Sequence, residues 1–473
     1  KHKKEICWAC NLEYDLINVF GEYIDKLLNL HYVSSGLRMA RLNREIGKIT
    51  FFDTVKHWPI SVKKMGEMIG LEKLEAEYTD SEKGIEYCQR DAEIVWKFVD
   101  QMLLKYDNLD LEIKSTLPSM ALQLHKQKYP VNCNHTLEPH FDFLRKSYFG
   151  GRVEIFRLGK IVQTINHYDV NSLYPSVMCD NEYPDIDSWY FTDRPDFTKF
   201  GCAEITIDMP YLYIPSLPVN ITQELIFPFG MLTGTWSYPE IRQALADGGK
   251  IYKVWKALEF DRSCNPFSEY IQFCYKKRLS SESIMENTFW KLFMNSLYGK
   301  YAQKGNLEII SHGRTHIISG NAKHVNVIWS SYVTSYARIK LLNYLRFSNV
   351  FYTDTDSIFT DSELSTGKDL GNLKLEGTYE SCNFVGNKIY TYGDKSKAKG
   401  VPQAQAENFI KYGKCVYNKP ARYKESKRCA LIPNKWYEVD KHLKKAYTKR
   451  RILQNEKTEP WEINEYQKSM GLS

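Results

Sequence analysis

Tyr352-Thr353-Asp354-Thr355-Asp356-Ser357 is the stretch of sequence that decides the fold. It continues the apolar run Asn349–Tyr352, so a short buried strand is expected to end at two carboxylates separated by one residue. Two like charges this close repel each other unless a cation lies between them. The stretch therefore predicts a strand–turn–strand that presents Asp354 and Asp356 to a cation. An exposed acidic turn is the alternative.

A third carboxylate stands at the end of another expected strand, at residues 160–168. That strand leads into Tyr168-Asp169-Val170-Asn171-Ser172-Leu173-Tyr174-Pro175-Ser176. An acid at a strand end, followed by a tight turn, offers a carboxylate and a backbone carbonyl to a hard cation such as Mg²⁺. A lone Asp at this place is more often a turn or helix-capping residue. On strands that neighbour those of Asp354 and Asp356, Asp169 would complete a two-metal site for phosphoryl displacement.

A helical stretch carries a different polar pattern. In Lys291-Leu292-Phe293-Met294-Asn295-Ser296-Leu297-Tyr298-Gly299, the residues Lys291, Asn295 and Tyr298 lie at i, i+4 and i+7 and share one helix face. A cation, an amide and an aromatic ring on one stripe can bind a triphosphate, a neighbouring strand and a base. An ordinary amphipathic helix with Phe293 and Leu297 on its buried side is the alternative.

Composition and charge narrow the class of protein. The chain has 473 residues, 26% of them charged and 43% hydrophobic, which favours several soluble domains over a disordered or membrane protein. Its 11 cysteines are scattered and odd in number, which favours reduced intracellular thiols. The net charge is +7, yet residues 388–473 hold 20 Lys and Arg against 9 Asp and Glu. Within them, Tyr417–Arg428 mixes cations with aromatic rings, which suits a polyanion with stackable bases or, alternatively, a solvated basic face.

Together the three segments resemble motifs A, B and C of family B DNA polymerases, DxxSLYPS, KxxxNSxYG and YxDTDS, and they come in the same order. Tyr148-Phe149-Gly150-Gly151 resembles the YxGG motif that links exonuclease and polymerase domains, and Lys388-Ile389-Tyr390 resembles the KxY motif that holds the primer terminus. The resemblance covers nearly the whole chain. It is closest to the protein-primed members, from bacteriophages, viruses and linear plasmids.

The resemblance implies a role for each matching residue. Asp169 and Asp356 would bind two catalytic Mg²⁺ ions, for which Mn²⁺ can substitute, while Asp354 shares the site and the Val170 carbonyl assists. Tyr174 would stack under the deoxyribose and exclude a 2′-hydroxyl. The dNTP would be bound further by Lys291, which neutralises the triphosphate, Asn295, Tyr298, which backs the nascent base pair, and Arg278. The expected DNA contacts are Tyr148, Gly150, Gly151, Lys388, Tyr390, Arg422 and Lys424.

The N-terminal part resembles a 3′–5′ exonuclease without its first motif. Asn11-Leu12-Glu13-Tyr14-Asp15 resembles the second motif, NxxF/YD, and Tyr87-Cys88-Gln89-Arg90-Asp91 resembles the third, YxxxD, on a long helix expected over residues 81–106. Lys73 matches an auxiliary catalytic lysine, and residues 54–58 weakly resemble a single-strand-binding motif. Asp110-Leu111-Glu112 has the letters of the first motif, D-x-E, but follows the third. We expect an N-terminal truncation, with proofreading in the longer protein; a degenerate site is the alternative.

The expected architecture is therefore a multidomain α/β protein: a right-hand polymerase with palm, fingers and thumb behind a truncated, RNase H-like exonuclease domain. The expected segments are a partial exonuclease domain (1–108), a linker with the YxGG-like motif (109–159), palm with a candidate first protein-priming insertion (160–268), fingers (269–302), a hairpin as candidate second insertion (303–327), palm (328–399) and a basic thumb (400–473).

The expected function is template-directed addition of dNTPs to a primer 3′-hydroxyl, or to a hydroxyl of a terminal protein, in the replication of a linear viral or plasmid DNA. The expected partners are primer–template DNA, dNTPs and a terminal protein, with no membrane, and the chain is expected to be an intracellular monomer in a host cytoplasm or mitochondrion. The alternatives are an ordinary nucleic-acid-primed family B polymerase, a DxD sugar-nucleotide transferase, and a catalytically dead nucleic-acid-binding remnant. The last two would differ from a polymerase in dNTP turnover.

Overall fold

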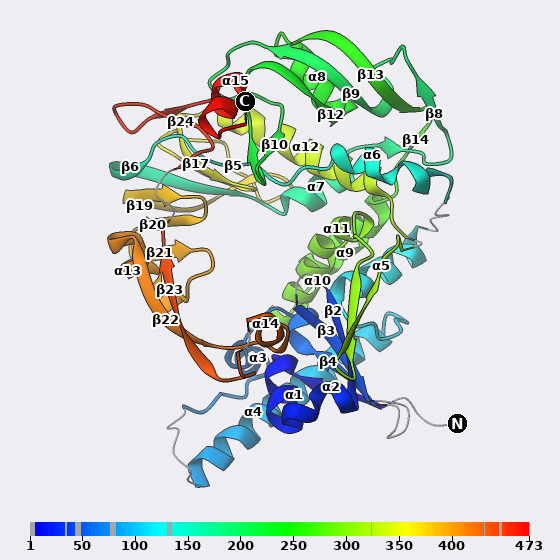
Figure 1. The fold of residues 1–473 in the computed structure, drawn as a ribbon, viewed down its shortest axis with the longest axis vertical. Helices are drawn as coiled ribbons and strands as arrows, with labels where there is room; N and C mark the ends of the chain where they lie inside the picture. The colour runs from blue at the N-terminus through cyan, green and yellow to red at the C-terminus, as the bar shows by residue number, and fades with distance from the viewer. Residues whose placement is uncertain are drawn as a thin grey trace. The chain divides into compact units, whose positions relative to one another are not determined.

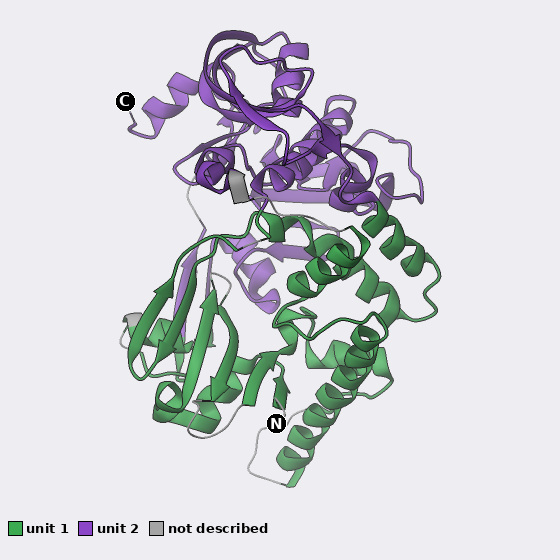
Figure 2. Cartoon of the chain, turned by 90° about the vertical axis from the view of Figure 1, so that its right-hand side faces the viewer, with its two compact units in different colours: residues 1–131, 269–325, 418–437 green, residues 132–268, 326–417, 438–473 purple. Residues whose placement is uncertain are grey.

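The chain forms two compact units, each assembled from three separate stretches of sequence (Figure 2). This computed structural model describes residues 5–33, 36–42, 49–75, 82–129, 135–322, 324–429, 431–443 and 447–472. Unit 1 comprises residues 1–131, 269–325 and 418–437, and unit 2 comprises residues 132–268, 326–417 and 438–473. Among the described residues, no helix is long and apolar enough to cross a membrane.

Unit 1 is built on a six-stranded sheet in the order β1-β4-β3-β2-β15-β16. Figure 1 labels three of its strands, β2, β3 and β4. β1 and β4 are parallel, and the other neighbours are antiparallel. The strands are β1 (Glu5–Ala9), β2 (Leu28–Val33), β3 (Gly36–Leu42), β4 (Ile49–Asp53), β15 (Leu307–Ser311) and β16 (Arg314–Ile318). The turn of the β15–β16 hairpin has positive φ at His312 (49°) and Gly313 (72°), which a two-residue hairpin turn favours.

The helices of unit 1 follow the sequence patterns closely. The helix expected over residues 81–106 is α4 (Glu82–Asp107), and the helical stretch over 269–301 divides into three helices. Ser283 caps α10 by accepting a hydrogen bond from the backbone N–H of Glu286, 3.1 Å away, in a Ser-x-x-Glu sequence typical of helix starts. The other helices are α1 (Leu12–Phe20), α2 (Ile24–Leu27), α3 (Val62–Ile69), α5 (Leu117–Lys128), α9 (Ser268–Leu279), α10 (Ile284–Ser296), α11 (Tyr298–Tyr301) and α14 (Tyr423–Cys429).

Unit 2 contains a seven-stranded sheet in the order β21-β20-β19-β6-β18-β17-β5. All its described neighbouring pairs are antiparallel, and the residues of β17 and β18 are buried throughout. Such strands read as continuous apolar runs because both faces are covered. The strands are β5 (Val153–Ile155), β6 (Gly159–Val170), β17 (Val350–Asp354), β18 (Ser357–Thr360), β19 (Leu373–Gly386), β20 (Ile389–Tyr392) and β21 (Lys395–Ala398).

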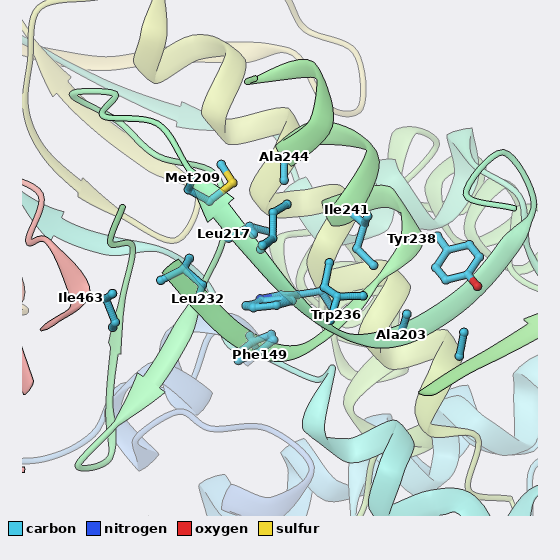
Figure 3. Close-up of a cluster of buried hydrophobic side chains, with 13 residues drawn as sticks. Phe149, Ala203, Met209, Leu217, Leu232, Trp236, Tyr238, Ile241, Ala244 and Ile463 are labelled. Carbon is cyan, nitrogen blue, oxygen red and sulfur yellow. The ribbon is translucent and has the colours of Figure 1, made fainter. Parts of the chain in front are cut away.

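A second, four-stranded sheet of unit 2 has its own hydrophobic core. Its order is β12-β9-β13-β8, and α8 (Tyr238–Ala246) packs against β9 and β12. Trp236 and Ile241 lie in the centre of this core, which Figure 3 shows around the strands. The strands are β8 (Trp189–Thr192), β9 (Phe200–Met209), β12 (Gly230–Ser237) and β13 (Lys250–Phe260).

The helix α12 (Val327–Arg346) packs against several other elements of unit 2. It contacts α6 (Phe141–Lys146), α7 (Leu173–Asp180) and α8, and it is buried on most of its surface. The hydroxyl of Tyr332 is hydrogen-bonded to both the N–H and the carbonyl of Gly201 on β9, at 2.6 and 2.9 Å. Its buried residues include Ser331, Ser335 and Arg338 besides the apolar ones, and these polar groups are hydrogen-bonded within unit 2.

The remaining elements are short. Two-stranded ribbons are formed by β7 (Tyr183–Pro184) with β14 (Ser263–Cys264), β10 (Val219–Ile221) with β11 (Glu224–Ile226), β22 (Lys414–Pro420) with β23 (Trp436–His442), and β24 (Arg451–Ile452) with β25 (Thr458–Glu459). The helices α13 (Gln403–Tyr412) and α15 (Ile463–Ser469) complete unit 2.

The expected division into successive segments stays a prediction, and the structure groups those segments differently from a simple succession. The expected linker 109–159 contains two α-helices, α5 and α6. α5 buries Met120 and Leu124 in unit 1, whereas α6 buries Phe141 and Leu144 in unit 2. The expected thumb is also divided. Its residues 418–437 belong to unit 1, whereas the buried Arg450 lies in unit 2, where its guanidinium is 3.5 Å from Glu154 of β5.

Candidate active site

The three carboxylates expected to bind metal lie on adjacent strands of the seven-stranded sheet. Asp169 on β6 is directly opposite Ser357 of β18, and Ser357 is directly opposite Asp354 of β17. The backbone N–H of Val170 donates to the carbonyl oxygen of Asp356 at 2.8 Å, which joins the two motifs. All three carboxylates line one cavity of about 360 Å³. The antiparallel register of β6, β18 and β17 therefore brings motifs A and C to a single place.

The turn between β17 and β18 has a strained centre. Thr355 has a φ of 67°, and its N–H donates to the carbonyl of Arg152 at 2.8 Å. Gly151 of the YxGG-like segment lies so close that a Cβ there would be 2.8 Å from Thr355 Cγ2 and 3.0 Å from the Tyr174 hydroxyl. A non-glycine residue in the left-handed region is costly and survives where its surroundings fix it. The segment carrying Gly151 is one of those surroundings, and it also contacts Tyr174.

The YxGG-like segment is fixed from its other side by a buried ion pair. Arg338 of α12 donates to the carbonyl oxygens of Phe149 and Gly150, both at 2.8 Å, and is paired with Glu240 of α8 at 2.7 Å. Burial raises the pKa of the Tyr148 hydroxyl above its usual value. A buried charge needs such a partner and such hydrogen bonds to be tolerated.

Lys388 is the cation at the carboxylates. It lies in the turn between β19 and β20 with a φ of 60°, and its Nζ is 2.5 Å from Oδ1 of Asp354. Burial raises the pKa of the Asp356 carboxyl, and the Asp354 carboxylate raises it further. Tyr390 of the same KxY-like motif is buried, with its ring 4.9 Å from the ring of Tyr352. Tyr390 therefore packs against β17 and lines the cavity with most of its side chain buried.

The carboxylates are close together without being collected around one point. Among the described residues, no group of three or more His, Cys, Asp or Glu side chains is arranged to hold a metal ion. The oxygen donors themselves are of the kind that Mg²⁺ prefers, and two neighbouring carboxylates with one raised pKa favour a cation between them. The residues present thus fit a divalent cation by their chemistry, with Lys388 as the positive charge that the chain itself supplies.

Motif B lies on unit 1. Lys291 is exposed on α10, Asn295 donates its side-chain amide to the Lys291 carbonyl at 3.0 Å, and Phe293 and Leu297 are buried as the helical pattern predicts. Tyr298 is partly exposed and begins α11.

Arg278, expected to bind the dNTP, joins two helices of unit 1. Its Nε lies 3.3 Å from Oδ1 of Asn287, which links α9 to α10, and burial lowers the pKa of its guanidinium. Arg278 is thus half-buried beside the start of the helix that carries Lys291.

A cationic cavity of about 820 Å³ opens in unit 1 beyond the end of α10. Burial lowers the pKa of Lys300 in this cavity to about 8, and the nearby Arg38 lowers it further. The four basic residues that line it are Arg38, Lys56, Lys300 and Lys304. Glu308, also in the lining, is paired with Lys424 of α14 at 2.5 Å. Lys424, expected to contact DNA, is therefore neutralised here, whereas Arg422 is exposed.

The exonuclease-like residues form two groups in unit 1. Lys73 donates to the Tyr87 hydroxyl at 2.7 Å and is ion-paired with Asp91 on α4. At the other group, Asn11 has a φ of 65° and its N–H donates to Asp53 Oδ1 at 3.1 Å. Burial raises the pKa of Asp15, and the Asp53 carboxylate raises it further.

The acids of both groups act electrostatically on Cys10. Burial raises the pKa of its thiol, and the charges of Asp53, Asp15 and Asp91 raise it too. Asp53 is the residue that the motif comparison missed. It ends a short strand, β4, much as Asp169 lies near the end of β6. That shared position was the available signal.

Comparisons with known proteins agree with this geometry. The family model of DNA polymerase type B, organellar and viral, matches residues 61–353. A probable DNA polymerase of Podospora anserina is 27% identical over 71% of this chain and 34% of its own length, and the DNA-directed DNA polymerase of Enterobacteria phage PRD1 is 25% identical over 78% of this chain and 72% of its own. The chain spans about a third of the length of the fungal relatives in Podospora anserina and Neurospora intermedia.

Solved structures show the same fold. The phi29 DNA polymerase, in its ternary complex with primer–template DNA and incoming nucleotides, covers 93% of this chain with 91% of its own, at 18% identity and a TM-score of 0.71. The expected right-hand polymerase fold is confirmed by this match, and the expected family by the match over residues 61–353. The chain belongs to the type B DNA polymerases of organelles and viruses.

Proposed function

We propose that this chain is the catalytic part of a DNA-directed DNA polymerase, which adds dNTPs to a primer 3′-hydroxyl. The observation that carries the proposal is the cavity in which Asp169, Asp354 and Asp356 meet at the ends of adjacent strands. Membership of the type B family supports it, as do relatives that are named DNA polymerases. Phosphoryl transfer needs little covalent help from the protein, so positioned charge is the main requirement.

The same cavity is the proposed Mg²⁺ site. Asp169 and Asp356 would hold two ions, with Asp354 and the Val170 carbonyl beside them. When bound, such ions lower the pKa of the attacking hydroxyl and stabilise the charge of the leaving pyrophosphate. Lys388 lies against these acids, with its Nζ donating a hydrogen bond to Oδ1 of Asp354 at 2.5 Å.

The remaining substrate contacts are proposed for side chains that solvent can reach. The exposed ammonium of Lys291, with Asn295 and Tyr298 on the same face, would bind the triphosphate and the nascent pair. Tyr174, half-buried against Gly151, would limit the space at the sugar. The cationic cavity of unit 1 offers four positive charges to a single strand, which is bound mainly through its phosphates.

The test is primer extension by Asp354→Asn and Asp356→Asn enzymes. Asp361→Asn is a matched control, because this exposed carboxylate directly follows β18, and it bonds Gln163 and Asn349 outside the cavity. We expect loss of at least about 10³-fold in the first two enzymes, the size of effect seen when charge stabilisation of a transition state is removed. Extension that survives in both would exclude the cavity as the active site.

Protein priming is a further part of the proposal. Two additions support it: the four-stranded sheet lies between motifs A and B, and the β15–β16 hairpin follows motif B. The partner would be a terminal protein whose hydroxyl side chain accepts the first nucleotide. Incubation with dNTPs and DNA ends, with and without that protein, tests this. Initiation at such ends with an oligonucleotide alone would contradict it.

A 3′–5′ exonuclease is the second candidate function, and the two acidic groups that act electrostatically on Cys10 favour it. Asp15, Asp53 and Asp91 would bind metal there, Tyr87 would contact the scissile phosphate, and Lys73 would assist. The test is degradation of single-stranded DNA in Mg²⁺, which an Asp91→Asn change should stop. Degradation that is the same with and without that change would contradict a nuclease site here.

A further inference from the structure

The strand β13 carries a regular sequence, Lys250-Ile251-Tyr252-Lys253-Val254-Trp255-Lys256, in which lysine and an aromatic residue recur every three positions. A regular strand alternates its faces every two residues, so such a sequence would scatter its lysines over both faces. The register of β13 with β9 shows otherwise. It shifts between Ile251 and Lys253 and again between Val254 and Lys256, so the two aromatic residues are the extra residues of two β-bulges.

The two bulges put the three lysines on one face. Lys250 is opposite Asp208, Lys253 is opposite Thr206 and Lys256 is opposite Glu204. These three partners are alternate residues of β9, so their side chains lie on the same face of the sheet. The opposite face carries Ile251 and Val254, which pack on the hydrophobic core shown in Figure 3. Each lysine therefore advances by two residues of β9, or about 6.7 Å. That advance is close to the repeat of phosphates along an extended nucleic-acid strand.

The bulged aromatic side chains are exposed beside the lysines. Tyr252 is 65% exposed and Trp255 is 55% exposed. The Trp255 ring is held in place, because its indole N–H donates to Thr206 Oγ1 at 2.9 Å and the Lys253 ammonium lies 3.3 Å from the ring centroid. β-Bulges of this kind re-aim side chains and are built features rather than defects. A large ring fixed at the surface has no packing role that explains its exposure.

The basic residues of this face exceed its acids by one charge, because Lys250, Lys253, Lys256 and Lys146 stand against Glu204, Asp208 and Asp193. Glu204 is 3.5 Å from Lys146, and Asp208 is opposite Lys250. Asp193 lines a shallow cavity of about 470 Å³ with Trp255 and Lys256. Lys253 has no acid opposite it on β9, and the Lys256 ammonium lies over the ring of Phe191, 4.4 Å from its centroid. The face therefore offers a row of ammonium groups with aromatic rings between them.

We propose that this row, the lysine–aromatic strip of residues 250–256, binds single-stranded nucleic acid outside the carboxylate cavity. The lysines would follow the phosphates, and Tyr252 and Trp255 would stack on bases. Single-strand-binding surfaces combine a basic track with aromatic platforms, and stacking is worth about 1–3 kcal/mol per base. An acidic protein surface would need the charges but not two exposed rings at the same repeat, one of them held in place by Thr206 and Lys253.

The test uses fluorescent oligo(dT) and an enzyme whose polymerase cleft is saturated with a hairpin primer–template. Every variant, parent included, carries Lys300→Gln/Lys304→Gln, which removes two of the four positive charges of the cationic cavity of unit 1. The lysine variant is Lys250→Gln/Lys253→Gln/Lys256→Gln, and the matched control is Trp96→Ala/Lys97→Gln, because Trp96 is 68% exposed beside a lysine of α4 that lies on no such row. We expect the lysine variant to bind at least tenfold more weakly and the control to bind as the parent does. The dependence of log affinity on log salt should become shallower by about 2, because each phosphate that a lysine neutralises contributes ~0.7 to that slope.

The ring variant separates stacking from charge. Tyr252→Ala/Trp255→Ala should weaken binding of oligo(dT) but not of an abasic oligomer of the same length, and Trp255→Phe should recover most of the loss. Equal loss for both oligomers would overturn the stacking role. If every strip variant binds oligo(dT) as the control does, the proposal is wrong. The strip would then be assigned to binding of an acidic protein partner. The Asp356→Asn enzyme should bind oligo(dT) as the parent does, so failure of the strip and failure of the polymerase are distinguishable.

Discussion

The ammonium of Lys388 lies 2.5 Å from a carboxylate oxygen of Asp354, so a turn between β19 and β20 neutralises the end of β17. The Asp354 side chain is 6% exposed, and a buried carboxylate without a partner is costly. This pair joins the KxY-like motif to motif C. It makes the acidic cavity tolerable in a chain that has bound no metal ion.

Removal of the Lys388 ammonium should reveal the free-energy cost of a buried Asp354 carboxylate without a partner. Lys388→Met is expected to lower the free energy of unfolding in EDTA by about 1 kcal/mol, the lower part of the range for an unsatisfied buried group, because Lys388 is itself partly solvated. Mg²⁺ should restore most of the loss, since it supplies the missing positive charge, and Lys388→Arg should lose less. Urea unfolding with and without Mg²⁺ measures both. Equal unfolding of Lys388→Met in the two buffers would contradict a cation site here.

Gly151→Ala should damage the active centre while Gly150→Ala should not. A Cβ on Gly151 would press on Thr355 and on the Tyr174 hydroxyl, whereas one on Gly150 would meet nothing within 4 Å. Thr355 is at the centre of the turn that carries both acids, so we expect primer extension to fall by at least about tenfold, or ~1.4 kcal/mol in barrier. Circular dichroism should find both variants folded. Equal primer extension by Gly151→Ala and Gly150→Ala would contradict the close packing of Gly151 on Thr355 and Tyr174.

Single-strand binding by unit 1 should weaken above about pH 8. Lys300 is protonated below its lowered pKa of about 8 and so adds a positive charge to the cavity, and this charge is lost as the pH rises. Fluorescence anisotropy of an oligonucleotide between about pH 7 and 9 would follow the change. Lys300→Arg should flatten this profile, because a guanidinium stays charged throughout. A profile that is unchanged in Lys300→Arg would assign the pH dependence to another group.

Trp58→Ala should disturb the helix that carries motif B. Trp58 is fully buried in unit 1, 5.0 Å from the ring of Phe98 on α4 and 6.2 Å from that of Phe289 on α10. Loss of such a side chain costs about 3–5 kcal/mol. We also expect a higher KM for dNTPs in the variant, because Lys291 and Phe289 share a helix. Val19→Ala, at a 74% exposed position, is the control. A loss of stability with an unchanged KM for dNTPs would contradict an effect of Trp58 on the helix that carries Lys291.

Much of the local structure could be predicted from the sequence, because apolar periodicity and turn residues act over short distances. The strand before Asp354, the helix expected over residues 81–106 and a hairpin within residues 303–327 are all observed. The meeting of Asp169 with Asp354 is also observed, but it rested on the resemblance as well as on strand ends.

Pairings between distant segments could not be predicted in this way. Nothing local indicates that β15 pairs with β2, that Lys388 binds Asp354, or that Lys424 binds Glu308. Asp53 was missed because it belongs to none of the matched exonuclease motifs, although it ends a short strand as Asp354 does. These features depend on register and charge between elements far apart in the chain, which periodicity does not encode.

The pairing of β2 with β15 also has a consequence for synthesis. During translation, β2 leaves the ribosome roughly 270 residues before its partner, so a nascent chain carries an open strand edge while those residues are made. The last stretch of unit 1, residues 418–437, emerges later still. The N-terminal sheet can therefore be completed only late, and the unfinished edge is a natural binding place for a chaperone. Fusion of a late-folding tag would not shorten that wait, whereas a circular permutation beginning near residue 303 would.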